Sequence, residues 1–175
     1  MKKKEITSSI ILHALLLITV YIFQGAIFPF IPIGGFIPLL LPVVVTGIAL
    51  YEGRYTGGLS GLFAGILCDI SFNQPVGTFT VFLTVVGLGV GILSDTVVLS
   101  GFMTYYFGCA AVLIISAFVQ MTPIVALPNN IPTAVLMGTA IGQTIYSLIL
   151  AFPIWFLVRA LGRRAERITP SGRIL

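Results

Sequence analysis

The sequence predicts an all-α membrane protein, a compact bundle of six transmembrane helices. Hydrophobic residues make up 58% of the 175 residues, and charged residues make up only 8%. A soluble domain carries about 25% charged residues, because it has to present a polar surface to water. The mean hydropathy of +1.13 instead fits a chain that exposes apolar side chains to lipid. We expect a single polytopic membrane domain over residues 1–175.

Six apolar segments of the chain are candidates to cross the hydrocarbon layer. About 20 apolar residues span its roughly 30 Å, and fewer suffice where the flanking backbone is buried in protein. The expected spans are residues 7–28, 36–51, 55–72, 76–93, 98–121 and 133–161.

Each break between these spans has its own turn chemistry. The first break is the Pro- and Gly-rich stretch FPFIPIGGFIP, and the second span is short, with Pro38 and Pro42 near its start. The later breaks contain, in order, the sequences EGR, NQP, SD and LPNN. The distinct breaks favour six spans over a smaller number of longer ones.

The basic residues indicate how the bundle is oriented. With six spans, both termini and the second-to-third loop lie on one side of the membrane. All nine basic residues then fall on that side: Lys2, Lys3, Lys4, Arg54, Arg159, Arg163, Arg164, Arg167 and Arg173. Basic residues concentrate on the cytoplasmic side of membrane proteins, so both termini are expected in the cytoplasm. The terminal clusters can contact anionic membrane lipids, whereas nucleic acid is not an expected partner.

A stripe of small residues runs down the third span and ends in an acid. Its members are four apart, which places them above one another on one helix face: Gly57, Gly61, Gly65 and Asp69. In lipid, a face without side chains lets another helix approach closely. The other helix could belong to the same chain or to a partner protein, and the spacing leaves both alternatives open.

Asp69 is the most unusual residue of this stripe. It lies about 20 Å along the third span from Tyr55, toward the outer side, where the chain has no Lys or Arg. Its expected partners are the polar side chains of Ser71, Asn73 and Thr78, or backbone N–H groups of the following loop. We expect Asp69 to hold this loop in place. A protonatable carboxylate in a transport path and a contact to a partner protein are the functional alternatives.

The sequence offers little basis for catalysis or for a cofactor. It contains no nucleophile–base pair, no close pair of carboxylates and no phosphate-binding loop. Cys68 and Cys109 lie in separate apolar runs without CxxC spacing, so buried free thiols are expected rather than a metal site or disulfide. We therefore expect a protein that is not an enzyme and that has no cofactor.

Residues 52–91 resemble the core motif of MreD, the bacterial rod-shape-determining membrane protein family. That family shows a glycine-rich third helix ending in Asp, a short loop with Pro-x-Gly, and another glycine-containing helix. The matching positions in this chain are Gly57, Gly61, Gly65, Asp69, Pro75 and Gly77. The six spans, the proline-marked second span and the short basic tail agree in outline.

This resemblance implies a non-enzymatic component of the cell-elongation machinery in the bacterial cytoplasmic (inner) membrane. MreD proteins associate with MreC, which connects them to RodA and a class B penicillin-binding protein and to MreB filaments on the cytoplasmic side. The family is similar in fold to the S components of energy-coupling-factor transporters. An S-component-like bundle is thus expected here.

The same fold likeness leaves a second function open, namely capture of a vitamin-like molecule by an S component. Such a site needs several converging donors and acceptors. The outer loops offer mainly four amide side chains: Asn73, Gln74, Asn129 and Asn130. This scarcity favours a scaffold protein that binds partner membrane segments.

Overall fold

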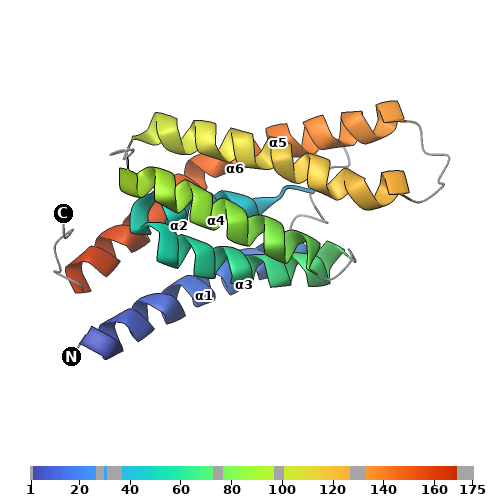
Figure 1. The fold of residues 1–175 in the computed structure, drawn as a ribbon. Coiled ribbons are helices and arrows are strands. Elements are labelled where there is room, and N and C mark those ends of the chain that lie inside the picture. The colour runs from blue at the N-terminus through green and yellow to red at the C-terminus, as the bar shows by residue number, and fades with distance from the viewer. Residues whose placement is uncertain are drawn as a thin grey trace.

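A computed structural model of the chain describes residues 2–26, 30, 37–72, 77–96, 101–126 and 133–168. Within these ranges the longer elements are all α-helices and there is no strand, so the predicted all-α class is confirmed. The helices are α1 (Lys2–Ala26), α2 (Leu40–Glu52), α3 (Arg54–Phe72), α4 (Thr78–Thr96), α5 (Phe102–Ala126) and α6 (Thr133–Ile168). Successive helices run in opposite directions, and the start of α1 lies at the same end of the molecule as the end of α6 (Figure 1).

The first turn of α2 lies later in the chain than expected. The helix begins at Leu40 rather than at residue 36, and residues 37–39 are not helical. Ile37 precedes Pro38, and the residue before a proline is disfavoured in helical conformation, which explains why the helix does not include Ile37. Pro42 lies in the first turn, where its missing N–H removes no hydrogen bond within the helix.

Helices α1 and α6 both run past the expected spans at the end that carries the basic residues. α1 begins at Lys2 instead of residue 7, and α6 continues to Ile168 instead of residue 161. The added sequences contain KKKE and RRAER, in which Lys, Glu, Ala and Arg are strong helix formers. Hydropathy marks only the apolar part of a helix and therefore missed these polar turns.

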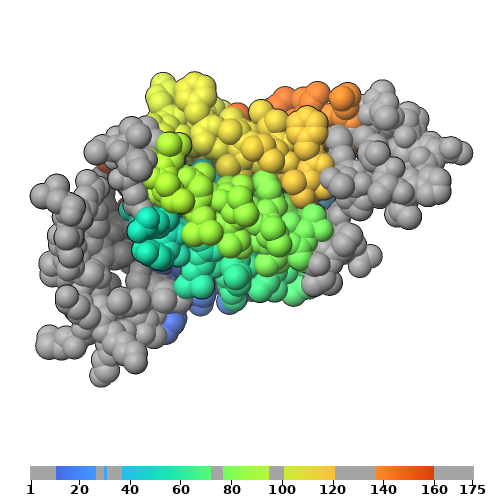
Figure 2. Space-filling model, in the orientation of Figure 1, coloured from blue at the N-terminus to red at the C-terminus, as the bar shows by residue number. Residues whose placement is uncertain are grey.

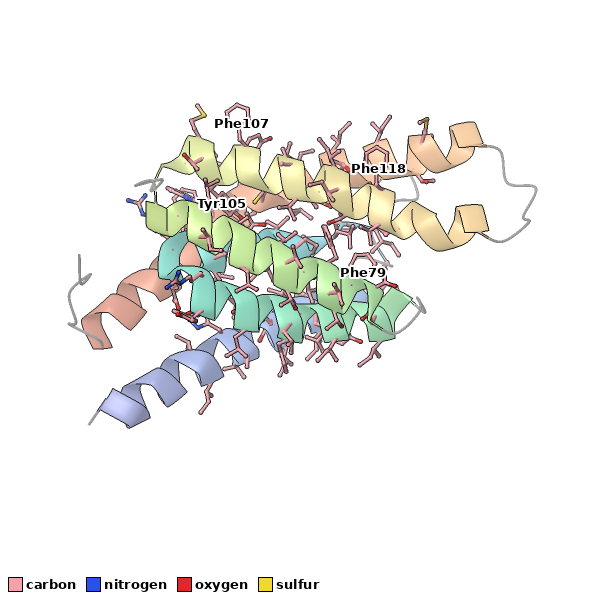
Figure 3. The ribbon with its side chains drawn as sticks, in the orientation of Figure 1. Phe79, Tyr105, Phe107 and Phe118 are labelled. Atoms are coloured by element: carbon pink, nitrogen blue, oxygen red, sulfur yellow. The ribbon has the colours of Figure 1, made fainter. Side chains whose placement is uncertain are left out.

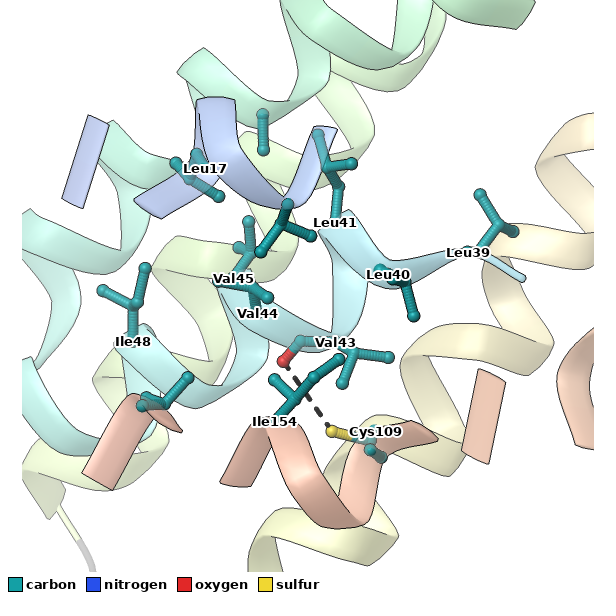
Figure 4. Packing of buried hydrophobic residues seen from close by; sticks show 14 of the residues in the cluster. Leu17, Leu39, Leu40, Leu41, Val43, Val44, Val45, Ile48, Cys109 and Ile154 are labelled. Atoms are coloured by element: carbon teal, nitrogen blue, oxygen red, sulfur yellow. Dashed lines mark hydrogen bonds between the residues drawn. The ribbon is translucent and has the colours of Figure 1, made fainter. Parts of the chain in front are cut away.

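α2 is the central helix of the described bundle. Its residues Leu40–Leu50 are all buried, and it packs against α1, α3, α4, α5 and α6. Figure 4 shows its aliphatic side chains surrounded by neighbouring helices, with the Cys109 thiol of α5 3.9 Å from the Val43 carbonyl oxygen. A helix that is apolar on every face requires such a position.

The outer helices expose large apolar side chains. Figure 2 shows α3, α4 and α5 side by side on one face of the molecule, and Figure 3 shows Phe107 and Phe118 of α5 pointing away from it. Two described segments, Phe102–Gln120 and Met137–Arg159, are long and apolar enough to cross a membrane. Soluble monomers rarely expose so much contiguous apolar surface, so the described part of the chain indicates membrane association.

Candidate functional site

The carboxylate of Asp69, in the last turn of α3, is buried against the start of α4. Its Oδ2 accepts hydrogen bonds from the backbone N–H of Gly77 at 2.8 Å and of Thr80 at 3.2 Å. Its Oδ1 accepts one from the N–H of Phe79 at 2.8 Å, and the Thr80 hydroxyl donates to Oδ2 at 2.6 Å. Four donors thus converge on one side chain that is 6% exposed.

Asp69 performs the task that an N-cap side chain usually performs within its own helix. The first N–H groups of a helix have no partner inside it, and the N-cap side chain normally accepts from the second or third of them. The residue before α4 is Gly77, which has no side chain and a φ of +103° that favours glycine. Asp69 therefore caps α4 from the neighbouring helix, and the positive end of the α4 dipole stabilises its charge.

The glycine stripe brings Asp69 to this position. A Cβ atom on Gly61 would collide with the carbonyl oxygen of Leu83, and one on Gly65 would collide with the backbone of Thr80. The backbones of α3 and α4 therefore touch directly along the stripe. Asp69 follows Gly65 by four residues, one helical turn further, which carries its carboxylate under the first turn of α4.

The structure brings five of the six predicted site residues together along this hairpin of α3 and α4: Gly57, Gly61, Gly65, Asp69 and Gly77. Pro75 lies outside the described residues. Of the two alternatives that the spacing left open, the structure has the stripe packed within the chain, because α4 covers Gly61 and Gly65. The stripe is thus not a free docking surface for a partner helix in this structure.

The predicted role of Asp69 in holding the loop is also present in the geometry. Backbone N–H groups of the following loop were among its expected partners, and the N–H of Gly77, just before α4, bonds to it. The other two N–H groups, of Phe79 and Thr80, lie in the first turn of α4. The side-chain hydroxyl that bonds to it is that of Thr80, however, which was not among the expected partners Ser71, Asn73 and Thr78. Asn73 lies outside the described residues. Thr80 lies in the first turn of α4, which the contact of α4 with the glycine stripe places beside Asp69.

The start of α2 is capped in the same manner, which the sequence did not reveal. Ser147 of α6 accepts a hydrogen bond from the N–H of Leu39 at 2.8 Å, and Gln24 of α1 accepts one from the N–H of Leu40 at 3.0 Å. Both side chains are buried. Two side chains from two helices thus satisfy the N–H groups at the start of a third.

We predict that Ser147→Ala lowers the free energy of unfolding by about 1–3 kcal/mol, the cost of leaving one buried N–H unpaired. Ser116→Ala is the matched control, because Ser116 is equally buried but donates only to the Val112 carbonyl of its own helix. Unfolding of the detergent-solubilised chain by SDS measures both variants. Equal losses would contradict the capping role of Ser147.

A buried ionisable pair at the opposite end of the bundle was also missed. Nε2 of His13 on α1 lies 2.7 Å from Oε1 of Glu52, the last residue of α2. The side chains are 5% and 14% exposed, and polar groups so far removed from water are stabilised by such a contact. In the sequence, both residues lie near the end of the bundle that carries the basic residues. This did not identify them as partners, because the contact depends on how α1 packs on α2.

The chemistry available to these residues is hydrogen bonding between helices. In the described ranges, no three His, Cys, Asp or Glu side chains lie together as a metal site would require. Cys68 and Cys109 are buried free thiols, as expected.

Comparison of the chain with protein-family models, with curated proteins and with solved structures gives no match. The likeness to the MreD family therefore rests on the residues of the hairpin and on the outline of the chain.

Proposed function

We propose that this chain is a non-enzymatic component of the bacterial cell-elongation machinery, an MreD-like scaffold that spans the cytoplasmic membrane six times. Its basic end, with both termini, faces the cytoplasm. The proposed direct partner is MreC, through which the chain connects to RodA and a class B penicillin-binding protein, and MreB filaments lie on the cytoplasmic side.

The observation that carries this proposal is the hairpin of α3 and α4. The residues of the MreD-like motif are the ones whose chemistry the hairpin uses: glycines where two backbones touch, an aspartate that caps the next helix, and a glycine with positive φ. A chance run of small residues would not be expected to end in an acidic residue that lies level with the first turn of the next helix.

The helix lengths support the six-span arrangement. α3 and α4 have 19 residues each, which at 1.5 Å per residue is about 28 Å, close to the hydrocarbon thickness of about 30 Å. α2 has 13 residues and reaches only about 20 Å. Such a short helix is compatible with a membrane because the N–H groups at its start bond to Gln24 and Ser147 and are not left unpaired in the hydrocarbon layer.

The buried polar groups favour a scaffold over an S component. A site for a vitamin-like molecule requires polar side chains that are free to turn toward a ligand. Asp69, Gln24 and Ser147 already accept hydrogen bonds from backbone N–H groups. The apolar outer faces of α3, α5 and α6 are the surfaces on which partner membrane helices can pack.

Affinity purification from membranes tests the proposal. We predict that the tagged chain, expressed in a rod-shaped bacterium and extracted in mild detergent, retains MreC, detected by mass spectrometry. The matched control is a vitamin-binding S component with the same tag, which should retain no MreC. Recovery of the ATPase module of an energy-coupling-factor transporter with the chain would overturn the proposal.

A further inference from the structure

α6 is longer than a membrane is thick. Its 36 residues extend about 54 Å, against about 40–45 Å for a bilayer with its headgroups. The apolar part ends at Arg159, and the helix continues through residues 160–168. From residue 159 to 168 the sequence RALGRRAERI has four Arg and one Glu, a net charge of 4 − 1 = +3.

The change from apolar to basic takes place at a rigid aromatic cluster. The indole N–H of Trp155 donates to the Tyr51 hydroxyl of α2 at 2.7 Å, and its ring packs edge-on against Phe102 of α5, with centroids 5.2 Å apart. The Phe156 ring also packs edge-on with the Trp155 ring, with centroids 4.8 Å apart. The position of the Trp155 ring is therefore fixed by three helices.

Arg159 is held on this ring. Its guanidinium carbon lies 4.8 Å from the centroid of the Trp155 ring, a cation–π contact, and the residue is exposed. The contact limits the conformations of a flexible side chain and so lowers the entropy lost on binding a ligand. Arg163 and Arg167 follow four and eight positions later in the sequence.

Exposed apolar rings lie beside this basic end. Phe152 and Phe156 are more than half exposed, and Phe152 also packs edge-on against Phe102. Along α6, then, exposed aromatic rings come first and arginines follow. An anionic phospholipid has the same order, with acyl chains followed by a phosphate, and guanidinium groups bind phosphate oxygens in pairs.

We propose that this end of α6 binds an anionic phospholipid of the cytoplasmic leaflet, with Arg159 on its phosphate and Phe152 and Phe156 along its acyl chains. The inference rests on the proposed membrane orientation, in which this end faces the cytoplasm. It goes beyond that function because it assigns a ligand class and a site. Anionic lipids are concentrated in the cytoplasmic leaflet, which basic residues near the surface recognise.

The single tryptophan of the chain provides a direct probe of this site, because its fluorescence arises at Trp155 alone. The full chain is reconstituted in vesicles of phosphatidylcholine and phosphatidylglycerol at one fixed ratio. In one sample the bromine quencher is on the phosphatidylglycerol acyl chains, near the headgroup, and in the other it is on the phosphatidylcholine. The ratio of the two quenching constants gives the preference of the site for the anionic lipid.

We expect brominated phosphatidylglycerol to quench Trp155 more strongly, by about five-fold per arginine engaged, the scale expected for one basic residue at an anionic surface. Arg159→Gln should reduce the preference to near one. Arg54→Gln is the charge-matched control, because Arg54 lies at the same end on α3. It should leave the preference unchanged. The ratio is taken within each variant, so a change in the fluorescence of Trp155 itself does not affect it.

Three results would overturn the lipid site: equal quenching by the two lipids, a preference that survives Arg159→Gln, or an equal loss in Arg54→Gln. Loss of the preference on adding inorganic phosphate, but not chloride of the same ionic strength, would identify a phosphate site instead and would also overturn it. Failure of the proposed membrane location gives a different result, since neither brominated lipid would then quench Trp155.

Discussion

Replacing Gly61 with leucine (Gly61→Leu) is expected to separate α3 from α4 and to unfold the hairpin. Even the first added atom, Cβ, would collide with the Leu83 carbonyl oxygen, which belongs to the backbone and cannot rotate away. The helices would have to move apart along the stripe, which would also withdraw Asp69 from the α4 N–H groups. We predict a loss of more than about 3 kcal/mol, above the usual range for overpacking.

The matched control is Gly89→Leu. Gly89 lies on α4, one helix away from Gly61, but a Cβ atom there has no atom within 4 Å. The added side chain would extend from the exposed side of α4, and leucine is a better helix former than glycine, so stability should change by less than about 1 kcal/mol. Unfolding in SDS measures both variants. Equal stability of the two would contradict direct backbone contact between α3 and α4.

The same pair of variants tests the scaffold proposal in cells. In a bacterium that depends on this chain for its rod shape, Gly61→Leu should give round cells and Gly89→Leu should give rods. Rod-shaped cells carrying an unfolded Gly61→Leu chain would show that cell shape does not require the hairpin.

The hairpin could be predicted from the sequence because its contacts are local. The spacing of four in the stripe defines one helix face without knowledge of the rest of the fold. Asp69 bonds to residues only 8 to 11 positions away, so the following loop and helix were the nearest donors. The choice of Thr80 over Thr78 was not predictable, because it depends on the residue at which α4 begins.

The caps of α2 could not be predicted, since they join distant parts of the chain. Leu39 and Ser147 are 108 positions apart, and Leu40 and Gln24 are 16 apart. A polar residue in an apolar span indicates that some partner exists but does not identify it. The same applies to His13 and Glu52, whose contact depends on how α1 crosses α2.

The two capped helix starts share a physical cause. α2 and α4 both begin at the end of the bundle away from the basic residues, and neither has a capping side chain of its own. Inside a membrane, water cannot satisfy the free N–H groups, so a neighbouring helix has to supply the acceptor. The side chains that do so, Asp69, Gln24 and Ser147, also fix how deep each helix lies relative to its neighbour.

Asp69→Ala is expected to have the second largest effect. It leaves three N–H groups without their acceptor, that of Phe79 in a buried position and those of Gly77 and Thr80 in part-buried ones. Each such donor costs about 1–3 kcal/mol, so the loss should be about 3 kcal/mol or more. Unlike Gly61→Leu, this change leaves the backbone contact of α3 and α4 intact, and the purified variant should remain helical by circular dichroism.

Asp69→Asn separates the capping role from a role that requires charge. The amide oxygen can occupy the position of Oδ2, which accepts three of the four hydrogen bonds, while the NH₂ group faces the Phe79 N–H and the attraction to the helix dipole is lost. Stability should fall by about 1–2 kcal/mol, and rod shape should persist. A carboxylate that moves protons or binds a partner by its charge predicts the opposite pattern, with Asn as damaging to function as Ala while the chain stays folded. Measuring unfolding and cell shape for both variants distinguishes the capping role from a charge-dependent role. Only the capping role predicts that the loss of rod shape parallels the loss of stability.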